Sequence, residues 1–313
     1  FKMINKKGIE FNFAWLFAII VGAVIIFIAI FATTSIIKTS RVESETKVAA
    51  QLGIILNPIE TNLEESKYAV ISFPDETRFF NGCRETGNFG RQLISTSVKS
   101  GIGKEFQEPE IENSFFNKYV FSKGIEQGKE LNVLAKPFEM PYKVADLLIA
   151  SAGDYCLVNP PGDIEDEVSD LNLKNINVSN SEENCPHGSE VVCFEKTGCD
   201  IDVNSQAQVV INDEKELYYE GPLLYGAIFA EPDIYECQLK RLMKREGELA
   251  HLYASKAEFL SGKGCTNNLA SDLRNFASLT QELKESKDIS IIAQEAERIR
   301  NKNVGTKRPS IVI

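Results

Sequence analysis

The chain has 313 residues, of which 43% are hydrophobic and 25% are charged, and its formal net charge is −11. This length and apolar content allow one or two hydrophobic cores and exclude a disordered chain. The acidic surplus lies in residues 42–231, which carry 33 acidic and 15 basic residues. Because phosphate binding needs clustered Lys and Arg, this balance argues against nucleic acid as a partner.

Residues 11–37 form an apolar stretch without a charged residue. A hydrocarbon core about 30 Å thick needs roughly 20 helical residues, and 13–32 supplies that length. Basic residues flank the stretch on both sides: Lys2, Lys6 and Lys7 before it, and Lys38 and Arg41 after it. The stretch predicts a transmembrane helix instead of a signal peptide, whose apolar region is roughly 7 to 15 residues long.

The orientation of this helix follows from the chain on either side of it. Basic residues near the two ends are equal in number, so the positive-inside rule gives no preference. About 270 residues and all seven cysteines follow the helix. We therefore expect a single-pass protein of the cell membrane with a cytoplasmic stub and an extracytoplasmic bulk. Asn177, in Asn177-Val178-Ser179, is then a glycosylation candidate.

Small residues mark one side of the apolar helix. Ala14, Ala18 and Gly22 lie four residues apart, a spacing that lets two membrane helices approach closely. This face is a candidate contact with a second copy or with another membrane protein.

Seven cysteines favour an oxidising compartment and are all disulfide candidates: Cys83, Cys156, Cys185, Cys193, Cys199, Cys237 and Cys265. One is odd, and the connectivity of the others stays open. If one helix continues from Cys237 towards Cys265, the two are roughly 40 Å apart, whereas bridged α-carbons lie about 4.4–6.8 Å apart. They cannot pair with each other, so we expect each to tie the C-terminal helices to the strand-rich part.

The periodicity after the membrane predicts an α+β protein. Short β-branched or aromatic runs at 67–73, 92–100, 117–122, 130–136 and 155–158 predict an antiparallel sheet or sandwich, interrupted by a short helix over 140–152. Strands resume between 190 and 220 as a small hairpin module. Helical patterns follow from Pro232 and Asp233 to a stop at Gly262 and Gly264, and then at 266–284 and 288–302, which predicts about three packed helices.

These patterns divide the chain as follows: a cytoplasmic stub (1–10), a transmembrane helix (11–37), a helical stalk (38–58), a β-rich domain (59–158), an acidic linker or loop (159–184), a Cys-rich β module (185–231), a helical unit (232–303) and a tail (304–313).

The sequence offers few groups for chemistry. It contains no Gly-x-Ser-x-Gly elbow, no phosphate-loop pattern and no His-Glu-x-x-His, so we expect no enzyme, no catalytic residue and no cofactor. Zinc has one candidate ligand set, namely Cys185, His187, Cys193 and Cys199, although disulfides compete for these sulfurs. Asp200, Asp202 and Asn204 alternate as calcium ligands do, but the sixth and twelfth positions lack the required glycine and glutamate.

The segment KKGIEFNFAWLFAIIVGAVIIFIAIF resembles the basic, glycine and apolar opening of type IV pilin-like proteins, and the likeness covers residues 6 to about 57. In that family a long helix carries a globular head and packs into a filament core. The whole chain also resembles uncharacterised single-pass archaeal envelope proteins, through the anchor and stretches such as PFEMPYKVADLLIASAGDYCLV.

We therefore expect a non-enzymatic, membrane-anchored surface protein that takes part in a multi-protein or repeating envelope assembly. Its partners would be membrane lipid and other envelope proteins or copies of itself. A type IV pilin-like filament subunit and an extracytoplasmic ligand sensor or enzyme are the alternatives.

Overall fold

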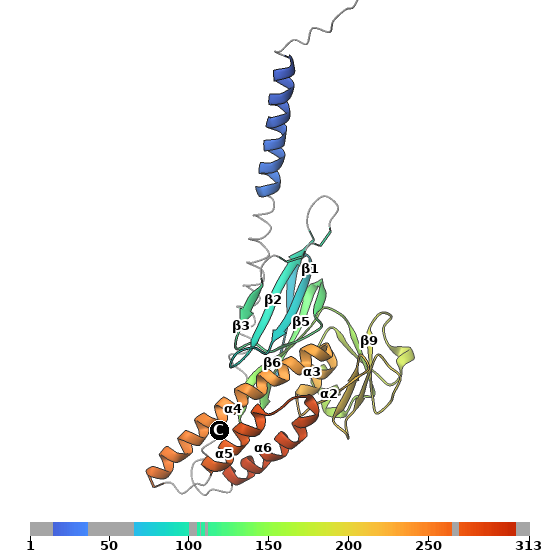
Figure 1. Cartoon of the computed structure of the whole chain (residues 1–313). Helices are drawn as coiled ribbons and strands as arrows, with labels where there is room; N and C mark the ends of the chain where they lie inside the picture. Colours follow the sequence, from blue (N-terminus) through green and yellow to red (C-terminus); the bar gives the residue numbers. More distant parts are fainter. Residues whose placement is uncertain are drawn as a thin grey trace, which may run out of the picture.

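A computed structural model gives the fold of the chain (Figure 1). It describes residues 15–36, 66–99, 105–106, 108–109, 112–264 and 269–304. The expected stub, the expected stalk, Ala14, Cys265 and the tail after residue 304 lie outside these residues.

The apolar stretch forms a helix over Trp15–Ile36. Its 22 residues span about 33 Å, close to the thickness of a hydrocarbon core. None of its most apolar part is buried against the rest of the protein. The helix is thus long and apolar enough to cross a membrane, and a signal sequence near the N-terminus has the same properties.

The described strands form two six-stranded sheets. In spatial order the first sheet contains β3 (Asn113–Phe115), β2 (Arg91–Val98), β1 (Lys67–Arg84), β5 (Ile125–Glu139), β6 (Lys143–Ser151) and β4 (Val120–Phe121). Its pairs are antiparallel except β4 with β6. The long strand β1 lies near the middle and pairs with both β2 and β5, so the expected antiparallel sheet is confirmed for this part.

In spatial order the second sheet contains β12 (Lys215–Tyr218), β11 (Val209–Asn212), β10 (Ile201–Asn204), β9 (Glu190–Phe194), β7 (Tyr155–Val158) and β8 (Ile176–Ser179). Hairpins join β10, β11 and β12, as expected. The other three pairs are parallel. Parallel neighbours need crossover connections, so this sheet is mixed and larger than the hairpin module that the spacing predicts.

The helices are α2 (Gly162–Asp170), α3 (Leu223–Phe229), α4 (Pro232–Gly262), α5 (Leu269–Gln281) and α6 (Ile289–Val304), with short 3-10 turns η1 (Glu182–Asn184) and η2 (Ser286–Asp288). The longest described helix of the head is α4, which begins at Pro232 as predicted and ends at Gly262, the first of the two predicted stop residues. In Figure 1 it runs from near α3 past the first sheet, with α5 alongside it and α6 alongside α5.

One continuous hydrophobic core joins both sheets to the helices. It includes Leu134 of the first sheet, Leu157 of the second, and Leu242 and Phe276 of the helices, all nearly inaccessible to solvent. A smaller cluster covers the other face of the first sheet. The strand-rich and helical parts therefore fold against each other instead of forming separate cores.

The short helix expected over 140–152 is wrong, because this segment forms β6. Val144 and Leu147 of β6 face the main core, whereas Leu148 and Ala150 face the smaller cluster. A strand buried on both faces loses its alternation of apolar and polar residues, so its periodicity cannot distinguish it from a buried helix.

The expected linker over 159–184 is also wrong, because it contains α2 and β8. With β7 these elements form a β-α-β crossover, in which α2 buries only Ile164 and Val168. The strand β7, expected in the β-rich domain, belongs to the second sheet. Because the segment has so few buried apolar residues among many acidic ones, its composition is that of a solvated loop, which is why the sequence predicted a linker.

Candidate functional site

The outer face of β10, β11 and β12 carries a hollow of about 340 Å³. Two rows of paired residues form its floor: Asn204, Val209 and Tyr218 in one, and Asp202, Ile211 and Glu216 in the other. The exposed loop 195–197 lines one side. The size falls in the range of small-ligand pockets, about 300–1,000 Å³, and its lining mixes apolar with acidic groups.

A disulfide between Cys193 and Cys199 closes the loop that borders this hollow. Asp202 holds the end of the loop, because its carboxylate accepts hydrogen bonds from the backbone N–H groups of Gly198 (2.9 Å) and Cys199 (3.0 Å). Gly198 has a φ of 101°, which a residue with a side chain rarely adopts. The loop wall of the hollow is thus fixed by one covalent bond and one carboxylate.

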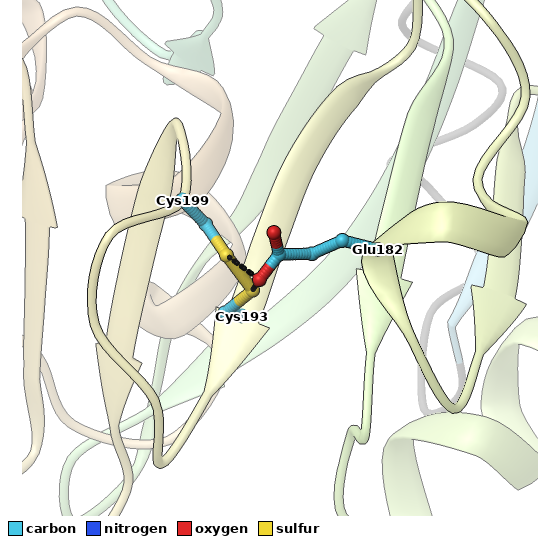
Figure 2. A group of neighbouring side chains, drawn as sticks. All are labelled: Glu182, Cys193 and Cys199. Carbon is cyan, nitrogen blue, oxygen red and sulfur yellow. Dashed lines mark hydrogen bonds between the residues drawn. A yellow bond between two sulfur atoms is a disulfide. The ribbon is translucent and has the colours of Figure 1, made fainter.

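Glu182, from η1, lies against the same disulfide (Figure 2). Its Oε1 is 3.1 Å from Sγ of Cys199 and 3.6 Å from Sγ of Cys193. In the disulfide form neither sulfur carries a hydrogen, so these are close contacts without a donor. The Nζ of Lys196 donates to the same carboxylate oxygen and balances its charge.

A second disulfide lies beside the first, between Cys156 of β7 and Cys185. Cys156, Val158 and Cys193 form a small buried cluster on one face of the second sheet, with Cys185 packed against it. The expected zinc set does not assemble from free thiols here, because Cys185 pairs with Cys156 and Cys193 pairs with Cys199. His187, the remaining member, lies exposed in a turn.

The three residues of the calcium pattern, Asp200, Asp202 and Asn204, each accept hydrogen bonds from backbone N–H groups. Asp200 accepts a hydrogen bond from the N–H of Val191 at 2.8 Å, and Asn204 accepts one from the N–H of Ala207 at 2.8 Å. Asp202 holds the disulfide loop as described. The alternation reflects turn chemistry at the two ends of β10.

A third disulfide, between Cys83 and Cys237, joins β1 to α4. The expected link of Cys237 to the strand-rich part is thereby confirmed. A buried amide pair accompanies it, because Nε2 of Gln238 donates to Oε1 of Gln92 at 2.6 Å and to the carbonyl oxygen of Val120 at 3.0 Å. Both glutamines are inaccessible to solvent.

Arg241 lies one turn further along α4 and is also fully buried. Its guanidinium donates to Oε1 of Gln238 at 2.6 Å and to the backbone carbonyl oxygens of Phe89, Phe116 and Lys118. Burial lowers the pKa of Arg241 to about 10. The guanidinium therefore connects α4 to two loops of the first sheet, a structural role that the helical pattern did not reveal.

Glu246 is an acidic residue of α4 that is buried without a hydrogen-bond partner for its carboxylate among the described residues. Its side chain is inaccessible, and neither carboxylate oxygen has a hydrogen-bond partner among the described residues. The hydroxyl of Tyr142 donates instead to the backbone carbonyl oxygen of Glu246, at 3.1 Å. Burial therefore raises the pKa of this carboxyl well above its usual range.

The remaining residues that the sequence singled out lie away from the cysteine cluster and the hollow. Asn177 lies exposed on β8, the edge strand of the second sheet, and stays a glycosylation candidate. Ala18 and Gly22 lie on the apolar helix, and apart from the backbone of its own helix and its chain neighbours no described atom lies within 4 Å of the position that a Cβ would take at Gly22. The sequence did not predict a role for Glu182. It lies in a polar, acidic segment, and only the fold places it next to the sulfurs of Cys193 and Cys199.

Comparison of the chain with protein-family models, with curated proteins and with solved structures gave no match.

The state of Glu246 predicts how stability depends on pH. The folded protein retains a proton that the unfolded chain releases above the ordinary pKa of 4.5. This group therefore lowers the free energy of unfolding as the pH rises above that value, by up to about 1.4 kcal/mol per pH unit until the raised pKa is reached. Glu246→Gln removes this contribution, so its stability relative to the wild type should increase with pH.

Urea unfolding between pH 4 and pH 8 measures the difference. Glu248→Gln, an exposed acid on the same helix, is the matched control and should follow the wild type. Equal pH dependence in Glu246→Gln and the wild type would show that Glu246 is ionised in the folded protein.

Proposed function

We propose that this chain is a non-enzymatic, membrane-anchored cell-surface protein that acts by contacting other proteins in a multi-protein or repeating envelope assembly. The observation that carries the proposal is the helix Trp15–Ile36, whose large apolar side chains are exposed along its length. A continuous apolar surface of this extent is stable in lipid and not in water.

The disulfides support an extracytoplasmic position for the head. Cys83–Cys237 and Cys156–Cys185 include buried sulfurs and join separate elements, so they contribute to the fold itself. Such bonds persist in oxidising compartments and are reduced in most cytosols. With the head outside, the side before residue 11 would be cytoplasmic.

Two large apolar side chains exposed on one side of α4 support a role in assembly. Leu252 and Phe259 are 64% and 65% exposed, and seven residues place them on the same side of the helix. The opposite side, which includes Ala250, Ala254 and Ala257, belongs to the main core. Leu252 and Phe259 lie about two helical turns apart on the exposed side, and we infer that this half of α4 meets a second copy of the chain through them.

The proposal also includes a stalk, a three-helix unit and a contact between membrane helices. A helical stalk over 38–58 would lift the head from the bilayer, and α4, α5 and α6 would act as one packing unit of three helices. Small residues around Gly22 would let the membrane helices approach each other.

Two alternatives have specific support. The resemblance of residues 6–57 to type IV pilin-like openings favours a filament subunit, in which the apolar helices pack together. The 340 Å³ hollow favours an extracytoplasmic ligand sensor or enzyme.

The anchor predicts that the chain stays in membranes after they are washed with alkaline carbonate. Mass spectrometry of this membrane fraction should recover peptides that include Trp15, and protease added to intact cells should cut the head. A signal sequence would instead leave a head that lacks Trp15 in the aqueous fraction, and that result would contradict the anchor.

The exposed face of α4 predicts self-association of the detergent-solubilised chain. Leu252→Lys with Phe259→Lys should weaken it at least about tenfold, because losses at contact hot spots exceed about 1 kcal/mol each. His251→Lys adds a charge to an exposed residue about 100° around the same helix and should leave association unchanged. Analytical ultracentrifugation measures all three, and a wild type that stays monomeric at high concentration would rule out this contact.

A further inference from the structure

The cluster in Figure 2 brings three potential metal ligands together from separate segments. Oε1 of Glu182, Sγ of Cys193 and Sγ of Cys199 all lie within 4.8 Å of one another. They come from η1, from β9 and from the end of the loop before β10. Cys193 is buried, Cys199 is half-buried, and the side chain of Glu182 is 39% exposed, so solvent reaches the cluster from one side.

Of the three distances between ligand atoms in this cluster, two match those of a tetrahedral zinc site and one does not. With Zn–S bonds of about 2.3 Å and Zn–O bonds of about 2.0 Å, sulfur and oxygen ligands lie about 3.5 Å apart. The carboxylate oxygen already lies 3.1 and 3.6 Å from the two sulfurs. Only the two sulfurs must separate, to about 3.8 Å, which is what breaking their bond allows.

The loop between the two cysteines permits this separation. Residues 195–198 are exposed, and the disulfide closes a sequence separation of only 6 residues. The other two disulfides span separations of 29 and 154 residues. Because the chain-entropy contribution of a disulfide is smaller for a shorter closed loop, this bond contributes least to the fold and can open with the least loss of stability.

We propose that Cys193, Cys199 and Glu182 form a redox-gated site for a thiophilic divalent cation of the zinc class. The disulfide form is closed to metal, and the dithiol form binds the cation through two thiolates and one carboxylate, with water as the fourth ligand. This site goes beyond the proposed role in assembly and does not depend on it. It also differs from the ligand set that the sequence predicts, because Glu182 replaces Cys185 and His187.

A dithiol reductant opens the site in two exchange steps. One thiolate of the reductant attacks Sγ of Cys199, the more exposed sulfur, and Cys193 leaves as a thiolate. The second thiolate of the reductant then attacks the mixed disulfide and releases Cys199. The reductant becomes a cyclic disulfide, two electrons and two protons pass to the protein sulfurs, and the cation later displaces the two thiol protons.

Charge in the cluster suits a divalent cation. Two thiolates and the Glu182 carboxylate carry three negative charges, of which the cation cancels two. Lys196, which now donates to Glu182, supplies the remaining positive charge. The side chain of Lys196 is 58% exposed, so its amine can move from the carboxylate oxygen to solvent while staying near the site.

The experiment uses the full chain in detergent, treated with limiting dithiol and then freed of it without air. Cobalt serves as the spectroscopic probe, because thiolate ligation gives charge-transfer absorption and a tetrahedral site gives strong visible bands. We expect the reduced protein to take up one cobalt ion that zinc displaces, and the oxidised protein to take up none. Alkylation followed by mass spectrometry should show that zinc protects Cys193 and Cys199 while Cys265 stays reactive.

Variants separate this site from other thiols. Cys199→Ser should abolish the absorption, and Glu182→Gln should weaken cobalt binding by at least about tenfold, the effect of losing even an outer-shell partner. Glu183→Gln, the adjacent exposed acid, is the matched control and should bind as the wild type does. Circular dichroism checks that each variant is folded, and alkylation reports on the two cysteines even where a variant is not.

Two results would overturn the proposal. One is a reduced wild type whose Cys193 and Cys199 are alkylated equally with and without zinc. The other is a Glu182→Gln variant that binds cobalt as tightly as the wild type does.

Discussion

The attachment of α4 to the first sheet is the constraint on which the rest of the head depends. The Cys83–Cys237 disulfide joins an early strand to the long helix across 154 residues, and the second sheet, α2 and α3 all lie within the segment that it closes. In the chain-entropy description, closing a loop longer than about 100 residues contributes about 5 kcal/mol. Gln238 and Arg241 then satisfy backbone carbonyls that would otherwise be buried without a partner.

This attachment also explains why α4 contains polar residues where a helix in a core is usually apolar. Gln238 and Arg241 each have hydrogen-bond partners, so their burial specifies one position of the helix on the sheet. Glu246, further along the same helix, has none for its carboxylate, and burial raises the pKa of this carboxyl. The helix α4 thus carries buried polar side chains with hydrogen-bond partners, Gln238 and Arg241, and one without, Glu246. Only Gln238 and Arg241 fix the position of the helix on the sheet.

Much of the fold could be predicted from local patterns. Pro232 and Gly262 set the bounds of α4, β-branched runs marked most strands, and the uncharged run before Ile37 marked the apolar helix. The failures have a common physical cause, which is that burial depends on neighbours far along the chain. β6 is buried on both faces and shows no alternation, α2 buries only two residues, and Glu182 meets its sulfurs only after β9 has formed.

The three disulfides are of two kinds: those that join distant elements and one that closes a short loop. The whole account depends on the disulfides between distant elements being formed in the cell. Cys83–Cys237 joins distant elements, whereas Cys193–Cys199 closes a short exposed loop beside the hollow. The most direct test is to alkylate free thiols in intact cells and then map tryptic peptides without reduction. The account predicts that peptides 79–84 and 216–240 are recovered as one disulfide-linked species. Recovery of both peptides with alkylated Cys83 and Cys237 would contradict it.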